Sequence, residues 1–267
     1  MIADEEVVQL FRDILDTSVG FTDSGTPRRP LQILRGIPGY LWKDAHPGGC
    51  NRHMTVFKKF DVIPKYCFDC YKVLITPRTI VELFKLLLIF EKITLPLDNS
   101  RKCMVEVRDD CSGTYKGFIY CRGIQEGNEV RKIVRKMVSE DISPKVPITL
   151  KRGCSEYAHV HPKYARTRPG EVIMQYVKDW QVKEDFFDKN FVFHPDIPNV
   201  NADIPNVNAD GRTTYTPWEV FSMQYWIRYA ATIGDLSYLA ITGMTMPPIP
   251  NLKRPSFVTT TPLKRNK

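Results

Sequence analysis

Tyr71-Lys72-Val73-Leu74-Ile75-Thr76-Pro77 is the stretch that decides the predicted fold, because a strand ends and a helix begins within it. Residues 71–75 show the alternation of a half-buried strand, and Thr76 followed by Pro77 is typical of a helix N-terminus. The apolar residues that follow predict a helix over 77–92, which ends before Pro96. The chain therefore switches from strand to helix here, as the first half of a βαβ unit does.

The next residues predict the rest of such a unit. Residues 103–108 and 116–121 alternate again on either side of a turn signal at 109–113, which predicts a hairpin. Apolar residues at helical spacing then predict a helix over about 125–140. A last strand follows at 148–152.

The element order over residues 66–154 is therefore βαββαβ, the pattern of the ferredoxin-like architecture. We expect an α+β protein with this ferredoxin-like core. An irregular N-terminal extension (1–65), with one amphipathic helix at 4–16, precedes it, and a loop-rich helical extension (155–245) and a basic tail (246–267) follow.

Two features stand out in the C-terminal extension. Residues 196–202 recur unchanged at 203–209, and their prolines and asparagines favour a duplicated loop. Thr216-Pro217-Trp218-Glu219 is a capping box that predicts the start of an aromatic-rich helix reaching about Ala231.

Composition excludes several classes of protein. The chain has 267 residues, of which 43% are hydrophobic, and its longest apolar run is Leu86-Leu87-Leu88-Ile89-Phe90. A membrane span needs roughly 20 apolar residues, and the acidic N-terminus lacks the pattern of a secretory signal. We therefore expect no membrane segment and a cytoplasmic location. In that setting the seven cysteines are expected to be free, metal-bound or reactive.

Positive charge is concentrated in the middle of the chain. The net charge is +8, and residues 101–168 alone hold 15 basic and 8 acidic side chains. Five more basic residues and no acidic ones lie in residues 251–267. This distribution predicts an anionic partner, which leaves open nucleic acid, an anionic small molecule and an acidic protein, unless the charge only solvates the surface.

The strongest local signal is a pair of short cysteine and histidine spacings. Cys50-x2-His53 is followed by Cys67-x2-Cys70. Two-residue spacings of this kind let both ligands of a pair reach one tetrahedral zinc ion. Cys67 and Cys70 face opposite sides of an ideal strand, so their joint use as ligands requires a turn between them.

The predicted sheet adds further thiols to this pair. Strand order 4-1-3-2 places Cys121, Cys154 and, one strand further out, Cys103 at the sheet end where the first strand starts. Alternation predicts that these three point toward the helix-covered face. The candidate metal ligands, for zinc or an iron–sulfur cluster, are Cys50, His53, Cys67, Cys70, Cys121 and Cys154. The alternative is that they are buried free cysteines, which behave as small hydrophobic residues.

Charged side chains stand next to two of these cysteines. Arg122 follows Cys121, and Lys151, Arg152 and Glu156 flank Cys154. Arginine recognises carboxylate and phosphate through its planar fork, so these four residues are candidates for binding an anionic cofactor or substrate. The alternative is a set of salt bridges at the strand end.

Three functions follow from these patterns. The first is a metal-binding protein, a metalloenzyme or redox protein acting on an anionic ligand. The second is an RNA-binding module with an RRM-like sheet, since Phe118 and Tyr120 fall where such domains carry base-stacking aromatic residues. The third is a non-catalytic interaction protein. The sequence contains no Ser-His-Asp order, P-loop or HExxH motif, and it leaves open whether the protein is an enzyme.

Overall fold

The computed structural model describes residues 4–16, 32–35, 49–107, 111–167, 170–191 and 215–242. The strands are β1 (Gln32–Arg35), β2 (Cys70–Ile75), β3 (Arg101–Val105), β4 (Tyr115–Arg122) and β5 (Ile148–Arg152). The helices are α1 (Asp4–Asp16), α2 (Gly49–Phe60), α3 (Ile80–Lys92), α4 (Gly123–Asp141), α5 (Ser155–Val160), α6 (Trp180–Asn190), α7 (Pro217–Thr232) and α8 (Ser237–Thr242). Two 3-10 turns are η1 (Lys65–Asp69) and η2 (Pro162–Ala165). Within the described residues no helix is long and apolar enough to cross a membrane.

The five strands form one sheet in the order β1-β3-β4-β2-β5, and all neighbours are antiparallel. The register places Lys72 of β2 between Tyr120 of β4 and Lys151 of β5. The fold is therefore mixed α+β. The expected four-stranded sheet was wrong by one strand, because β1, from the extension predicted to be irregular, pairs with β3 at the edge. The strand order as a whole thus differs from that of a simple ferredoxin-like fold.

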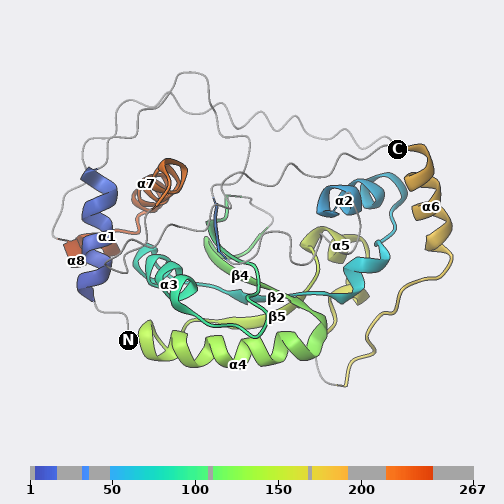
Figure 1. The fold of residues 1–267 in the computed structure, drawn as a ribbon, viewed down its shortest axis with the longest axis horizontal. Helices are drawn as coiled ribbons and strands as arrows, with labels where there is room; N and C mark the ends of the chain where they lie inside the picture. The colour runs from blue at the N-terminus through green and yellow to red at the C-terminus, as the bar shows by residue number, and fades with distance from the viewer. Residues whose placement is uncertain are drawn as a thin grey trace.

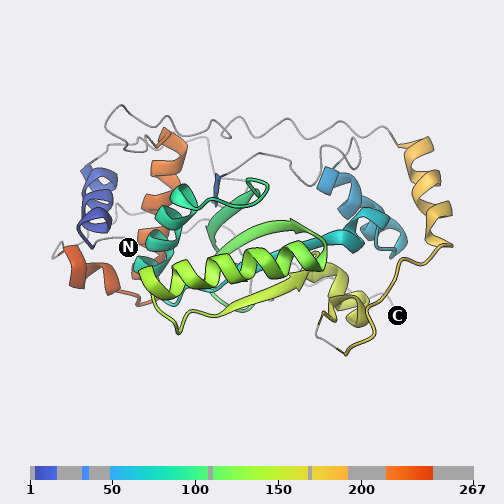
Figure 2. The same ribbon diagram turned by 60° about the horizontal axis from the view of Figure 1, so that its bottom comes forward.

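Helices α3 and α4 cover one face of the sheet (Figures 1 and 2). Their core partners are the alternate strand residues that point to that face, among them Val73, Ile75, Ile119 and Cys121. Helix α7 joins the same hydrophobic core through Met223, Trp226, Ile227 and Ala230. The aromatic residues of α7 are therefore packing residues.

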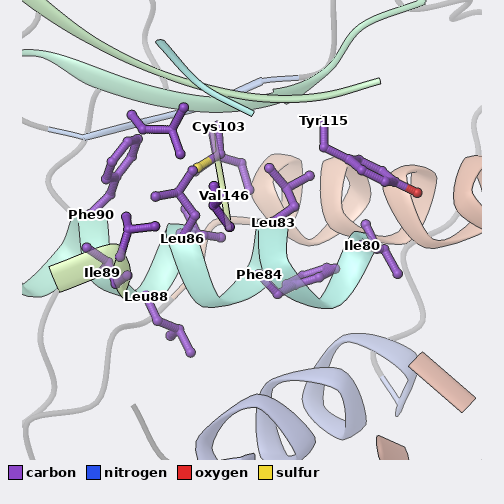
Figure 3. Close-up of a cluster of buried hydrophobic side chains, with 14 of the residues drawn as sticks. Ile80, Leu83, Phe84, Leu86, Leu88, Ile89, Phe90, Cys103, Tyr115 and Val146 are labelled. Carbon is purple, nitrogen blue, oxygen red and sulfur yellow. The ribbon is translucent and has the colours of Figure 1, made fainter. Parts of the chain in front are cut away.

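Helix α3 supplies the centre of this core (Figure 3). Nine of its residues are buried, since it packs against the sheet on one side and α1 and α7 on the other. Gly117 of β4 lets the sheet approach closely, because a Cβ atom there would overlap Leu86 and lie 3.2 Å from a ring carbon of Phe90.

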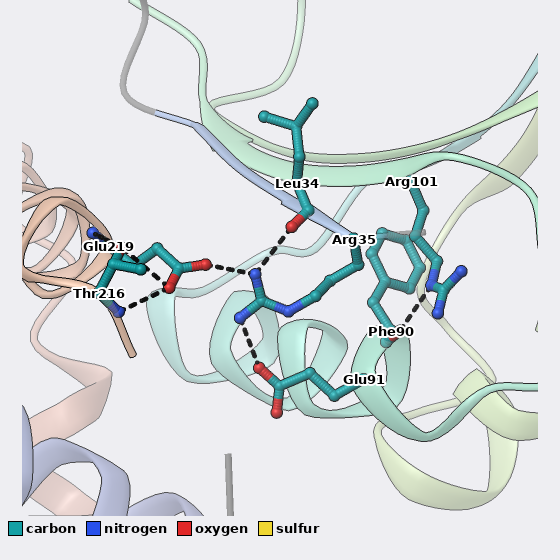
Figure 4. Close-up of polar contacts among 7 residues, drawn as sticks. All are labelled: Leu34, Arg35, Phe90, Glu91, Arg101, Thr216 and Glu219. Carbon is teal, nitrogen blue, oxygen red and sulfur yellow. Dashed lines mark hydrogen bonds and ion pairs between the residues drawn. The ribbon is translucent and has the colours of Figure 1, made fainter. Parts of the chain in front are cut away.

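A buried arginine ties the edge strand to two helices (Figure 4). Arg35 of β1 donates to Glu91 of α3 at 2.8 Å and also to Glu219 of α7. Glu219 in turn accepts from the backbone N–H of Thr216, which completes the predicted capping box. The N-terminal strand and the C-terminal helix are thereby fixed to the central layer.

Helices α2, α5 and α6 lie together on the side of the molecule away from α1, α7 and α8 (Figure 1). Arg52 of α2 is buried and pairs with Glu184 and Asp188 of α6. This ion-pair cluster holds α6 against α2.

Several element predictions are confirmed and several need correction. The predicted helix at 4–16 and strand at 148–152 agree with α1 and β5, and a hairpin joins β3 to β4. Helix α3 starts at Ile80 and not at Pro77, because the side chain of Thr79 caps it by accepting from the Glu82 N–H at 3.2 Å.

The prediction that the N-terminal extension is irregular was wrong for two segments, which form β1 and α2. The duplicated loop and the basic tail lie outside the described residues.

Candidate functional site

A cavity of about 230 Å³ lies at the end of the sheet where β2 begins and β5 ends. Its lining residues, which define what we call the thiol cavity, are Cys50, Met54, Cys67, Cys70, Gly153, Cys154 and Tyr157. Four of the six cysteine and histidine residues predicted as metal ligands therefore meet around one space.

Each of the four cysteines comes from a different local structure. Cys50 lies at the start of α2, Cys67 in the turn η1 and Cys70 at the first position of β2. Cys154 is the residue before α5. The turn η1 resolves the conflict noted for an ideal strand, because it lets both Cys67 and Cys70 face the cavity.

Gly153 sets the direction of Cys154. Its φ of +51° is a left-handed conformation that favours glycine, and its N–H donates to the Cys70 carbonyl at 2.8 Å. A Cβ atom at this position would overlap the side chain of Tyr164. The strand alternation therefore stops at Arg152, and Cys154 turns into the thiol cavity and not toward the helix-covered face as predicted.

Two tyrosines and their neighbours fix the wall around Cys67. Its sulfur lies 3.4 Å from the Tyr157 hydroxyl, and its carbonyl accepts from the Tyr164 hydroxyl at 2.5 Å. Both tyrosines belong to a small hydrophobic cluster with Phe57 and Phe68. The cysteine backbone is thus held by packing as well as by hydrogen bonds.

Burial makes the thiols hard to ionise. It raises the pKa of Cys50 and Cys67 well above their ordinary value and that of Cys70 to about 11. These three groups are therefore neutral thiols at pH 7 unless a cation binds them. In the described ranges, no three His, Cys, Asp or Glu side chains lie close enough together, as they stand, to hold a metal ion.

Lys72, which sequence reasoning did not select, lies beside the thiol cavity. Its ammonium nitrogen is 3.5 Å from the Cys154 sulfur. Burial lowers the pKa of Lys72, but the negative charge that Cys154 and Cys70 carry as thiolates outweighs that effect and raises it. The pKa of Lys151, the cross-strand neighbour of Lys72, is lowered by burial and by the charge of Lys72.

Two predicted metal ligands lie outside the lining of the cavity. His53 is buried on α2, with its ring 6.1 Å from that of Tyr66. Cys121 points into the helix-covered core, and its sulfur lies 3.9 Å from the Ile119 carbonyl. Cys103 also lies in that core and faces Gly117 across the strand pair. The expected gathering of five cysteines at one sheet end was wrong for Cys103, because its cross-strand neighbour Gly117 pairs with Ile75 at the other end of β2. Cys121 does lie at the expected end, opposite Tyr71, and points to the predicted face and so away from the thiol cavity.

The four residues predicted to bind an anion do not form one cluster of described contacts. Arg152 is buried between the rings of Phe68 and Tyr164, 4.9 Å from each centroid, and donates to the Phe68 and Met174 carbonyls.

The other three predicted anion-binding residues lie closer to the surface. Lys151 donates to the Ser155 hydroxyl at 2.6 Å. Arg122 is exposed at the end of β4, and Glu156 lies in the first turn of α5.

Part of the site left a signal in the sequence. Residues 49–60 carry two apolar stripes at helical spacing, Cys50, Met54 and Phe57 on one and His53, Val56 and Phe60 on the other. This double stripe is the pattern of a helix buried on two sides. No local pattern indicates the roles of Lys72 or Tyr157, because their neighbours in the site are distant in sequence.

Comparison of the chain with protein-family models, with curated proteins and with solved structures finds no match.

Without metal, the thiol of Cys70 is expected to make the protein less stable at alkaline pH. Its pKa of about 11 in the folded state exceeds the ordinary value of 9.0. A raised pKa means that its contribution is complete below about pH 9 and lost as the pH rises to about 11, a loss of about 2 to 3 kcal/mol. Urea unfolding of metal-free protein and of Cys70→Ala over this range measures it. A difference between the two proteins that does not change with pH would contradict the prediction.

Proposed function

We propose that the protein binds a metal centre through the thiolates of Cys50, Cys67, Cys70 and Cys154. The observation that carries this proposal is that four cysteines from three separate segments of the chain line one cavity. Thiolates are the ligands that zinc and iron–sulfur clusters prefer.

The open space between the thiols argues against their being only small hydrophobic core residues. Protein interiors pack to the density of organic crystals, and an unfilled void loses contacts along its whole lining. Cys103 and Cys121 behave as packed core residues, since both are completely buried among apolar neighbours. The four cysteines of the thiol cavity surround a volume that a ligand would fill.

The size of the cavity favours an iron–sulfur cluster over a zinc ion. One zinc ion lies about 2.3 Å from each sulfur, so four bound cysteines leave no open space between them. The cavity of about 230 Å³ exceeds several times the roughly 30 Å³ that one water molecule occupies. A cluster of several atoms held by four thiolates fits this volume better.

A centre with four cysteine ligands suits electron transfer or structural support. Hydrolytic zinc sites keep one coordination position open for water, whereas four thiolates occupy every protein-facing position. We therefore place the protein with redox or structural metal proteins, built on a ferredoxin-like core to which β1 adds a strand. An anion bound beside that centre would meet Lys72, which contacts Cys154, and Lys151, which contacts the next residue, Ser155. Arg122, Arg152 and Glu156 are the other residues proposed to bind it.

The decisive experiment is metal and sulfide analysis of full-length protein purified without oxygen. We expect about four iron and four sulfide per chain for a cubane cluster, with a broad visible absorption band. Replacing Cys67 or Cys154 by serine should remove the metal. Replacing Cys103 or Cys121 by alanine should not, because both lie in the separate hydrophobic core.

Each result of this experiment bears on the proposal. One zinc per chain, lost in the same two serine variants, would support the metal site but show that it holds zinc and not an iron–sulfur cluster. Protein without stoichiometric metal, or metal that persists in both Cys67→Ser and Cys154→Ser, would overturn the proposal.

A further inference from the structure

The face of the sheet opposite α3 and α4 carries a regular set of cations and aromatic rings. Alternation places Lys116, Phe118, Tyr120 and Arg122 of β4 on this face. The neighbouring strands add Lys72, Lys102 and Lys151. We call these seven residues the cationic face.

The two rings of this set lie next to lysine side chains. The nitrogen of Lys72 is 5.4 Å from the centroid of the Tyr120 ring, and that of Lys102 is 5.5 Å from the Phe118 ring. Phe118 and Tyr120 are two residues apart on one strand, so their rings stand side by side. Both side chains are partly exposed.

Two lysines of this face donate to groups that carry no charge. Lys102 donates to the Gln32 side chain at 2.8 Å and Lys151 to the Ser155 hydroxyl at 2.6 Å. Lys72 lies against the Cys154 sulfur, and Lys116 pairs with the carboxylate of Glu106 at 3.2 Å. The crowding of Lys72 and Lys151 also lowers the pKa of Lys151 after the larger effect of burial. An added anion would relieve that crowding.

Helices α3, α4 and α7 pack against the other face of the sheet, not against the cationic face. The core residues of α3, α4 and α7 belong to the cluster that contains Tyr71, Val73 and Ile119, which point to the opposite face. The aromatic helix α7 therefore packs on the side of the sheet away from Phe118 and Tyr120, and the stacking of bases on these rings is not blocked by it. Figure 2 shows α3 and α4 together on one side of the strands.

We infer that the cationic face binds single-stranded nucleic acid. A strand of this kind combines a repeating phosphate charge with unstacked bases, and proteins bind it with a basic groove and aromatic platforms. Lys102 and Lys151, with Lys72 beside the Tyr120 ring, supply the positive charge, and the rings of Phe118 and Tyr120 supply the platform. An acidic peptide would use the lysines but would gain nothing from the rings. The inference does not depend on the metal centre, although Lys72 borders both sites.

The test is fluorescence anisotropy of the full chain with labelled oligouridine and oligothymidine of about 12 nucleotides. Replacing Phe118 and Tyr120 together by alanine is expected to raise the Kd at least about tenfold, because each stacked base contributes on the order of 1 kcal/mol or more. Matched controls are Tyr66→Ala and Phe186→Ala, which remove exposed aromatic rings elsewhere and should leave the Kd unchanged. The ratio of the two affinities tells RNA from DNA binding.

Two further sets of variants and ligands distinguish a loss of stacking from misfolding, and binding of nucleic acid from binding of any polyanion. Leucine at both aromatic positions keeps the apolar bulk and should still lose the stacking contribution. Lys102→Gln should lower the slope of log Kd against log salt concentration by about one. Polyglutamate tests an acidic partner. No binding at low salt, a Kd unchanged in the alanine and leucine variants, or equal binding of polyglutamate would overturn the inference.

Discussion

Removing the proposed metal centre from the thiol cavity is expected to lower the free energy of unfolding by at least about 5 kcal/mol, since structural zinc ions contribute about 10–16 kcal/mol in zinc-finger peptides. The reason lies in the topology of the site. Its four cysteines come from three segments: the start of α2, the turn η1 with the start of β2, and the residue before α5. A metal centre would cross-link these three segments, and its binding energy would oppose their separation. Urea unfolding of anaerobically purified and metal-stripped protein measures the difference.

The same comparison should show opposite dependence on pH. Metal-bound cysteines are thiolates, so protons compete with the metal and the stability of loaded protein falls as the pH falls from about 8 to about 6. Without metal, the raised pKa of Cys70, about 11, leaves stability unaffected by this thiol in that range and lowers it only at higher pH. Cys154→Ser is the control, because metal treatment should no longer change its stability. Loaded and stripped protein with the same stability and pH profile would refute the prediction.

The sequence predicts those parts of the fold that depend on neighbouring residues. The alternation in 148–152 and the helical spacing in 4–16 indicated elements that the structure contains, because local periodicity reports which side of an element is buried. The four residues of β1 were missed, since a strand this short carries too little pattern. Its place in the sheet depends on pairing with β3, about 70 residues further along the chain.

The sequence predicted that cysteines would form the candidate site, but it did not predict which residues line the cavity. The spacing of Cys67 and Cys70 indicated a pair, and both line the cavity. Cys154 was assigned to the wrong face because the left-handed conformation of Gly153 breaks the alternation of β5. Arg152 was predicted to meet a ligand, but it donates to carbonyls of residues 68 and 174. Such distant partners leave no trace in the residues next to Arg152.

The second large effect is expected at Arg35, whose replacement by methionine should lower the free energy of unfolding by about 3 to 5 kcal/mol. Less than a tenth of the side chain of Arg35 is exposed, and the same holds for its partners Glu91 and Glu219. Methionine keeps most of the volume but leaves two carboxylates buried without their cation (Figure 4). Because these carboxylates belong to α3 and α7, the loss affects the attachment of both helices to β1.

Two controls separate the buried charge from the loss of an ordinary ion pair. Arg78→Ala breaks a pair between Arg78, which lies just before α3, and Glu82 of α3, but the Arg78 side chain is 47% exposed, so its loss should lower the stability far less than Arg35→Met. Adding Glu91→Gln and Glu219→Gln to Arg35→Met should recover much of the stability, because neutral amides are less costly to bury than carboxylates. Glutamine at 219 also retains an acceptor for the capping box of α7. Urea unfolding followed by tryptophan fluorescence reports these differences, since Trp226 of α7 is buried in the same core. If Arg35→Met costs no more than Arg78→Ala, Arg35 does not hold the edge strand to the two helices.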